Sequence, residues 1–384
     1  MTSTFFEILQ VAIGNRQTLT SCPTDEEWES LYNECEKHAL LGIAFAGVEK
    51  LPKEQCPPFD VLAEWLHDAQ VTKERNMLLD QKCKEVCEYF EHDGFDSCIL
   101  KGQSNLPNYL EYLRDYRTAG DIDVLCWPRN GRLDKVKVLA YVKELYATNR
   151  KDIKPGIMYH HVDWEFVGIP IEIHFRASFF LNPLSNWRFQ KWVNDRLHSS
   201  VCLKERDFPI PSVSFNAVYQ LVHIYRHLFS EGIGLRQLLD YYFVLHRLGD
   251  ERFEVRTQSG KIIDERLEIM SVIECLGMKK FASAVMYVLQ TVFAIPDAYL
   301  LCPIDKKEGD FLLSEIMISG NFGRNDNRVE TIGKVRSTKA HFATFIAREK
   351  FVSRLLRHYP SEAIWAPFWS VFFFIYIRWQ KWRW

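Results

Sequence analysis

Residues 99–126, ILKGQSNLPNYLEYLRDYRTAGDIDVLC, place acidic side chains inside an apolar strand pattern. Alternate side chains of a β-strand share one face, so Asp121 and Asp123 are expected to project together while Ile122 and Val124 pack into the core. A carboxylate in such a run is costly to bury unless it faces a site, a cation or water. This stretch therefore predicts a central strand with a functional site beside it.

A second apolar run supplies a third acidic position. In IEIH, residues 171–174, Glu172 is flanked by two isoleucines and shares its strand face with His174. Carboxylates gathered from neighbouring strands repel one another unless they hold a hard cation that prefers oxygen ligands. Asp121, Asp123 and Glu172 are thus predicted to bind Mg²⁺ or Mn²⁺.

The strand that precedes IEIH offers rival ligands. HHVDWEFV, residues 160–167, alternates apolar and polar side chains, and a turn predicted at 168–170 makes the two runs a hairpin. Asp163 and Glu165 lie opposite the apolar residues of their strand. Either of them is an alternative third carboxylate.

Helical periodicity surrounds these strands. Apolar residues recur at three- and four-residue spacing over residues 5–90 and again over much of the chain after residue 185. The alternation of strands and helices between these regions predicts an α+β fold with a small mixed sheet. We expect an N-terminal helical region, an α+β core and a C-terminal helical region, at 1–90, 91–205 and 206–384.

The segment after the strand FDSCIL, residues 95–100, has the features of a phosphate loop. Lys101-Gly102 ends that strand, and Ser104 is predicted to cap a helix with Pro107 in its first turn. Glycine before a helix N-terminus lets backbone N–H groups approach a phosphate. The alternative is an ordinary turn with Lys101 as a solvated charge.

Arg117, just before the acidic strand, has two interpretations. It either binds a triphosphate or orients an aspartate, or it forms a surface ion pair with Asp115 or Glu111. His223 and His227 share a helix face, which is the geometry of a two-histidine metal pair and also of ordinary helix packing.

The C-terminus, residues 363–384, is rich in aromatic residues and carries interleaved arginines and a lysine. The apolar run is shorter than the roughly 20 residues that a membrane span needs, and Pro367 interrupts it. Its composition suits a helix that lies on a membrane surface or docks on another protein, and equally a last helix that packs on its own domain.

Overall composition narrows the class of protein. The 384 residues carry a net charge of −2, so charge does not indicate a nucleic-acid partner and does not exclude one. The ten cysteines are scattered without a CxxC pair, and the N-terminus does not resemble a secretory signal. These features predict reduced thiols in a cytoplasmic protein.

Three motifs together resemble the nucleotidyltransferases of the DNA polymerase beta-type superfamily, and more closely a bacterial family of uncharacterised nucleotidyltransferases. They are Leu100-Lys101-Gly102, the run RTAGDID at 117–123, and IEIH at 171–174. The stretches LVHIYRH and GLRQLLDYY also look like that family's helical part, so the resemblance covers roughly residues 30–250. This chain departs from the superfamily in having Gln103 after Gly102, where serine or glycine is usual.

The resemblance implies transfer of a nucleoside monophosphate from an NTP to a hydroxyl of a small molecule, a protein or an RNA end. It assigns Asp121, Asp123 and Glu172 to two metal ions and to catalysis. The remaining site residues would bind the nucleotide or support the acids: Lys101, Gly102, Gln103, Ser104, Arg117 and His174. The alternatives are a non-catalytic nucleotide-sensing or partner-binding module on the same fold, and a metallohydrolase using the histidine pair.

Overall fold

The computed structural model describes residues 2–149, 155–203, 206–250, 254–256, 262–321 and 349–383. Its centre is a four-stranded sheet in the order β1-β2-β4-β3, with strands β1 Phe95–Leu100, β2 Ile122–Pro128, β3 His161–Phe166 and β4 Ile169–His174. β2 and β4 are parallel, whereas β1 pairs antiparallel with β2 and β3 pairs antiparallel with β4. The predicted α+β fold with a small mixed sheet is confirmed.

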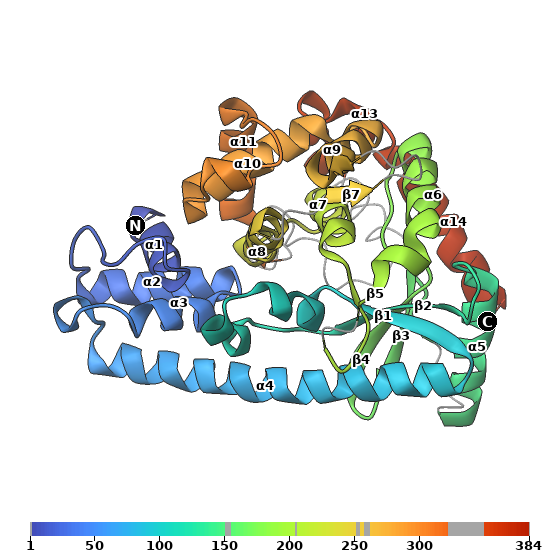
Figure 1. Ribbon diagram of the computed structural model, residues 1–384, viewed down its shortest axis with the longest axis horizontal. Coiled ribbons are helices and arrows are strands. Elements are labelled where there is room, and N and C mark those ends of the chain that lie inside the picture. Colours follow the sequence, from blue (N-terminus) through green and yellow to red (C-terminus); the bar gives the residue numbers. More distant parts are fainter. Residues whose placement is uncertain are drawn as a thin grey trace.

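A long helix joins the N-terminal helices to the sheet. α1 Thr2–Ala12, α2 Asp25–Lys37 and α3 Leu41–Val48 precede α4 Phe59–His92, whose 34 residues span about 51 Å. Figure 1 shows α4 passing along both the N-terminal helices and the sheet. Trp65, in its first half, packs into the core of the N-terminal helices, and Phe90, near its end, packs under the sheet. The N-terminal helices and the sheet thus share one rigid support.

The two faces of the sheet differ in chemistry. On one face, Ile122, Val124 and Ile173 pack in a core with α4 and with α5 Lys135–Asn149. On the other face lie Asp123 and Glu172. Figure 1 shows α7 Val213–Leu228 above the sheet, with α8 Leu235–Asp250 beside α7. The strand alternation predicted from the sequence therefore separates an apolar face from a polar one.

The prediction of an α-helix that begins at Ser104 is wrong. Two 3₁₀ helices occupy the segment instead, η2 Gly102–Asn108 and η3 Glu111–Tyr116. Lys101 and Gly102 both have positive φ values, 49° and 48°, so the chain turns sharply where strand β1 ends. The Ser104 hydroxyl does not cap a helix but donates to the Lys101 carbonyl oxygen at 2.8 Å. The helix dipole that a phosphate loop would use is therefore missing from this segment.

The hairpin turn lies one residue earlier than predicted. Val167 and Gly168 have φ values of 50° and 80°, as a two-residue type I′ turn requires. Ile169 already pairs with Phe166, and Pro170 with Glu165, so both belong to β4 rather than to the turn. The alternation of the two strands is nevertheless the predicted one.

Helices dominate the rest of the described chain. The predominantly helical C-terminal part is confirmed, while the division of the chain at residues 90 and 205 stays a prediction. None of the helices in the described ranges has the length and apolarity to cross a membrane. The further helices and short strands are α6 Pro183–Ser200, β5 Val201–Leu203, β6 Ile210–Pro211, β7 Glu254–Arg256, β8 Ile262–Asp264, α9 Glu265–Cys275, α10 Lys279–Phe293, α11 Lys306–Ser319, α13 Pro360–Ala363 and α14 Ala366–Arg383, with short 3₁₀ turns η1 Lys53–Gln55, η4 Asp297–Tyr299 and η7 Arg354–Arg357.

No disulfide joins the cysteines whose side chains are described. Cys83 and Cys87 lie one turn apart on α4 and are buried beneath the sheet. Burial raises the pKa of the Cys83 thiol well above its usual value, so this group packs as a small apolar side chain. The cytoplasmic location stays a prediction.

A buried carboxyl group ties α13 to the segment that follows β4. Glu362 accepts hydrogen bonds from the backbone N–H groups of Leu181 and Asn182, the second at 3.1 Å. Burial raises its pKa from 4.5 to about 7, in spite of these two bonds. The folded state therefore binds a proton more tightly than the unfolded chain does.

This raised pKa predicts a stability that falls as pH rises from 4.5 to 7. Below pH 4.5 the group is protonated in both states, and above pH 7 the folded protein holds a buried charge that costs about 3 kcal/mol. We expect Glu362→Gln to remove this dependence in urea unfolding curves measured across that pH range. Glu165→Gln, at an exposed position, should keep the slope of the wild type. An unchanged slope in Glu362→Gln would contradict the assignment.

Candidate functional site

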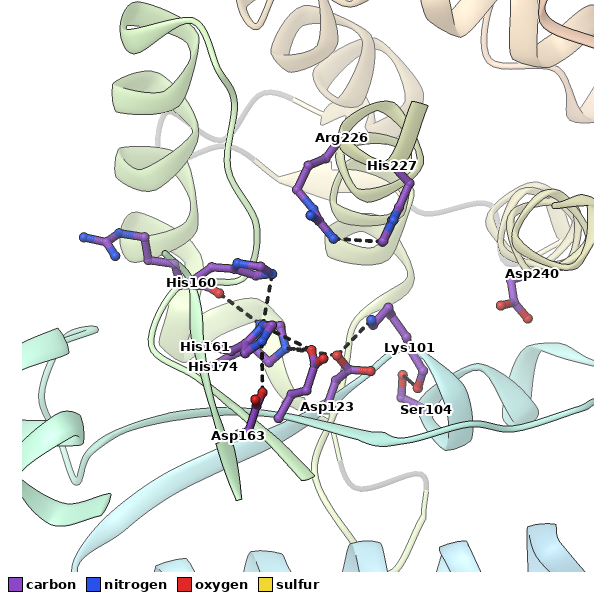
Figure 2. Close-up of polar contacts among 12 residues, drawn as sticks. Lys101, Ser104, Asp123, His160, His161, Asp163, His174, Arg226, His227 and Asp240 are labelled. Carbon is purple, nitrogen blue, oxygen red and sulfur yellow. Dashed lines mark hydrogen bonds and ion pairs between the residues drawn. The ribbon is translucent and has the colours of Figure 1, made fainter. Parts of the chain in front are cut away.

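Strand register brings two of the predicted acids together. Asp123 on β2 lies directly opposite Glu172 on the parallel neighbour β4. Two residues later on β4, His174 bonds both: its Nε2 atom lies 2.9 Å from Asp123 Oδ1 and 3.2 Å from Glu172 Oε2. Figure 2 shows His174 and Asp123 pointing toward each other on this face of the sheet. Asp123, Glu172 and His174 therefore form one cluster, as the alternation predicted.

Asp121 lies apart from this cluster. It precedes Ile122, the first residue of β2 that pairs with β4, and its side chain is exposed. In the described part of the chain, three groups of side chains place metal-ligating atoms within 4.8 Å of one another, and Asp121 belongs to none of them. The groups are His160–His161–His174, Asp123–Glu172–His174 and His161–Asp163–Glu172. The metal role of Asp121 therefore stays a prediction.

Two adjacent histidines that the sequence interpretation overlooked complete the cluster. His161 pairs with His174 across β3 and β4, and its Nδ1 and Nε2 atoms lie 3.2 Å from Glu172 Oε2 and 3.3 Å from Asp163 Oδ1. His160 is buried beside them, and burial lowers its pKa well below the usual value. Strand alternation could have identified His161, because it lies two residues before Asp163 and shares its strand face.

The two rival acids differ in position. Asp163 pairs opposite Glu172 across the hairpin and belongs to a cluster of potential ligands. Glu165 pairs opposite Pro170, farther along the hairpin, and belongs to none of these clusters. Of the two, only Asp163 lies where it can support the acidic pair.

Positive groups surround the buried Asp123 carboxylate. The Lys101 Nζ atom lies 2.8 Å from Asp123 Oδ1. Burial lowers the pKa of Lys101, but the negative charges around it, that of Asp123 first among them, together outweigh burial, and the net effect is a raised pKa. Burial likewise opposes protonation of His174, but its bonds to Asp123 and Glu172 raise its pKa to about 9. The same contacts lower the pKa of Glu172 to about 2, again against burial. An ammonium and an imidazolium therefore balance the two carboxylates at neutral pH.

A small polar cavity of about 40 Å³ lies between Asp123 and the helices above it. Asn105 and Gln237 line this cavity, and both are more than nine-tenths buried. Each uses its amide oxygen as an acceptor: Asn105 for the Gln220 amide at 2.5 Å and Gln237 for the Gly234 N–H at 3.0 Å. Their amide nitrogens, Asn105 Nδ2 and Gln237 Nε2, have no hydrogen-bond partner. The residues that line the cavity thus include two buried amide donors without a hydrogen-bond partner.

Two arginines flank this cavity. Arg117 Nε and Nη2 contact the two carboxylate oxygens of Asp240 at 2.6 and 2.7 Å, and both side chains are buried. The alternative of a surface ion pair for Arg117 is therefore wrong. Arg236 donates to the Thr118 carbonyl oxygen at 2.7 Å, and burial together with the nearby Arg117 lowers its pKa to about 10. Arg236 stays positively charged at neutral pH beside the unpartnered amides.

Some residues of the predicted phosphate loop line the cavity, and others are buried away from it. Gly102 lines the cavity, as does Asp121. Gln103 is buried away from it, where its amide donates to Asp80 Oδ1 at 2.7 Å. Ser104 is buried as well and keeps its bond to the Lys101 carbonyl. The phosphate-loop assignment of Gln103 and Ser104 gains no support from these contacts.

The histidine pair on α7 shares a face, as predicted, with ring centroids 4.3 Å apart. His223 lines the polar cavity, whereas His227 Nδ1 lies 3.2 Å from Glu231 and its Nε2 atom 2.8 Å from an Arg226 nitrogen. Burial lowers the pKa of His227 to about 4. Neither histidine belongs to any group of three potential metal ligands in the described residues. The metallohydrolase alternative therefore has no support.

Comparison with known proteins identifies the family of this chain. A family described as "Uncharacterised nucleotidyltransferase" matches residues 24–293, which include every strand of the sheet, the polar cavity and helix α8. No curated protein and no solved structure gives a significant match. Because the match covers well over half of the chain, this protein belongs to that family of nucleotidyltransferases.

Proposed function

We propose that this protein transfers a nucleoside monophosphate from an NTP to a hydroxyl-bearing acceptor in a metal-dependent reaction. The observation that carries the proposal is the pairing of Asp123 with Glu172 on parallel strands, beside a cavity lined with buried donors. Two carboxylates on one rigid sheet face are suitable ligands for a hard divalent cation. Mg²⁺ or Mn²⁺, when bound, would neutralise phosphate charge and acidify the acceptor hydroxyl.

Each acidic residue has a distinct part in this proposal. Asp123 and Glu172 hold the cation, and the exposed Asp121 adds a carboxylate at the open side of the cavity. A pKa of about 2 keeps Glu172 ionised and makes it a better ligand than proton acceptor. His174 fixes the two carboxylates relative to each other through its bonds to both.

The polar cavity is the proposed subsite for one terminal phosphate of the NTP. Its volume of about 40 Å³ accommodates roughly three water-sized atoms, comparable to the oxygens of one phosphoryl group. Asn105 Nδ2 and Gln237 Nε2 supply neutral donors, while Arg236 and Lys101 supply charge. Lys101 lies at the boundary, on Asp123, and is free to pair with phosphate when a cation takes its place. These side chains replace the glycine-loop backbone as the phosphate ligands.

Chelation of divalent ions tests the transfer reaction. We expect the protein, incubated with α-labelled NTPs and hydroxyl acceptors of several classes, to release pyrophosphate and label an acceptor. EDTA should abolish both signals, and added Mg²⁺ should restore them. Without a cation, the paired carboxylates repel the negatively charged phosphates of the NTP. Pyrophosphate release that survives chelation would contradict the metal dependence.

A nucleotide-binding module without turnover is the second candidate. One observation favours it: Lys101 Nζ and His174 Nε2 both contact Asp123 Oδ1, so the carboxylate already has cationic partners within the chain. Such a module would retain labelled NTP without releasing pyrophosphate, and its NTP affinity would be insensitive to EDTA. The same incubation therefore separates the two functions.

A further inference from the structure

The C-terminal helix α14 carries an exposed apolar stripe. Phe368, Val371, Ile375 and Trp379 lie at intervals of three and four residues, so they share one face of the helix. Phe368 is 66% exposed and Ile375 is 61% exposed. Large apolar side chains contribute little to folding when they face water, and a contiguous row of them marks an interaction surface. We call these four residues the α14 stripe.

The opposite face of α14 is already held by the protein. Trp369 stacks on Phe179 with ring centroids 4.9 Å apart, and its ring also lies 4.7 Å from Tyr159. Tyr376 is buried and donates to the Met158 carbonyl oxygen at 3.3 Å. Packing on its own domain is therefore real, and it buries one side of the helix. The side chains of the stripe stay exposed.

A large cavity opens on the same surface. Its volume is about 620 Å³, and exposed aromatic residues form its rim: Trp187 of α6, and Phe368 and Phe372 of α14. Figure 1 shows α14 running alongside α6 at this edge of the molecule. The charged residues that line the cavity, Lys135 and Arg176, are both basic, and no carboxylate lines it among the described residues. The cavity is apolar with a positive lining.

Charge along the helix has the same sign. The α14 sequence, APFWSVFFFIYIRWQKWR, contains no aspartate or glutamate and three basic residues, Arg378, Lys381 and Arg383. The whole chain is slightly acidic, with a net charge of −2, so this basic segment is a local feature. Tryptophan and other aromatic side chains are enriched at the membrane–water interface, where basic residues attract anionic headgroups.

We propose that the α14 stripe and the rim of the adjacent cavity dock on an anionic phospholipid bilayer, with α14 lying in the plane of the interface. The stripe would enter the headgroup region, and Arg378, near the C-terminal end of the helix, would meet anionic headgroups. The cavity is large enough to receive part of a lipid and offers that lipid positive rather than negative charge. A protein partner is a worse match, because its carboxylates would meet these cations only at a few fixed points. The inference is independent of the proposed transfer reaction.

Flotation of the full-length protein with lipid vesicles tests this docking surface. We expect binding to vesicles of phosphatidylcholine mixed with phosphatidylglycerol, weak binding to phosphatidylcholine alone, and weaker binding at high salt. The triple variant Phe368→Ser, Val371→Ser, Ile375→Ser should lower the affinity for the mixed vesicles about 100-fold. Arg378→Glu should lower it about tenfold.

Two controls make the result decisive. Phe59→Ser with Met77→Ser removes exposed apolar residues of α4 instead, and this variant should bind vesicles like the wild type. Thermal unfolding at the wild-type midpoint would show that the triple variant is folded. Absence of vesicle binding by the wild type, or equal binding by the folded triple variant, would overturn the proposal. So would a solution oligomer that the triple variant disrupts in the absence of vesicle binding, because the stripe would then serve a protein contact.

Discussion

Asp123→Asn is expected to reduce nucleotidyl transfer by about a thousandfold, which corresponds to about 4 kcal/mol of transition-state stabilisation. The amide has the shape of the carboxylate but lacks the charge that a divalent cation needs, and it cannot balance the Lys101 ammonium 2.8 Å away. The rate of pyrophosphate release at saturating Mg²⁺ and NTP measures this effect. Because Asp123 is buried, thermal unfolding of the variant should accompany the assay.

The chain offers a matched control for this substitution. Glu165→Gln makes the same chemical change on the polar face of the same sheet, at an exposed position outside the clusters of potential ligands. Its rate should stay within about twofold of the wild type, as for a typical surface change. Asp121→Asn should lower the rate as well, because that carboxylate lies at the open side of the cavity. Full activity in Asp123→Asn would rule out the proposed metal centre.

The second large effect concerns the polar cavity. We expect Gln237→Glu and Asn105→Asp each to weaken NTP binding about 100-fold, or about 3 kcal/mol, because a buried carboxylate replaces a donor that faces phosphate. Both substitutions preserve the existing acceptor bonds, from the Gly234 N–H and from the Gln220 amide. Calorimetric titration with a non-hydrolysable NTP and Mg²⁺ measures the affinity.

Asn108→Asp is the matched control for the cavity variants. Asn108 lies on η2 three residues after Asn105, but it lines a different cavity and accepts a hydrogen bond from Arg247 at 3.2 Å. A carboxylate at position 108 would pair with Arg247, so the folded state should tolerate the substitution. Because Asn108 lies outside the proposed phosphate subsite, NTP affinity should not change. If Gln237→Glu binds NTP like the wild type while Asp123→Asn is inactive, the phosphate subsite is wrong and the metal centre still stands.

Local patterns in the sequence were enough to identify the acidic pair and the histidine beside it. Asp123, Glu172 and His174 each sit at a polar position of an apolar alternation, and the sheet places all three on one face. Asp121 lines the same cavity as Asp123, but it lies before the first residue of β2 and outside the three groups of potential metal ligands in the described residues, so its metal role stays a prediction. Periodicity was wrong at Ser104, because the positive φ of Lys101 starts a 3₁₀ helix that periodicity does not distinguish from an α-helix.

Other parts of the site depend on residues that are far apart in the chain. Asn105 meets Gln220 across 115 residues, and Arg117 meets Asp240 across 123. Helical periodicity could not show these contacts, because only neighbours along one helix are visible before the helices are packed. No local pattern could show that the Gln237 amide is buried without a partner.

The sequence by itself determined which segments form the strands of the central sheet and which of their residues face away from the apolar core. It could do so because side-chain alternation and the cost of burying charge act within a few residues. Only the tertiary structure decided that Lys101 and His161 join Asp123 and Glu172, and that Arg236 and Gln237 line the cavity beside Asp123. Those contacts depend on the register of the sheet strands and on the packing of α8 against α7 and η2, and each requires distant segments to bury their surfaces together.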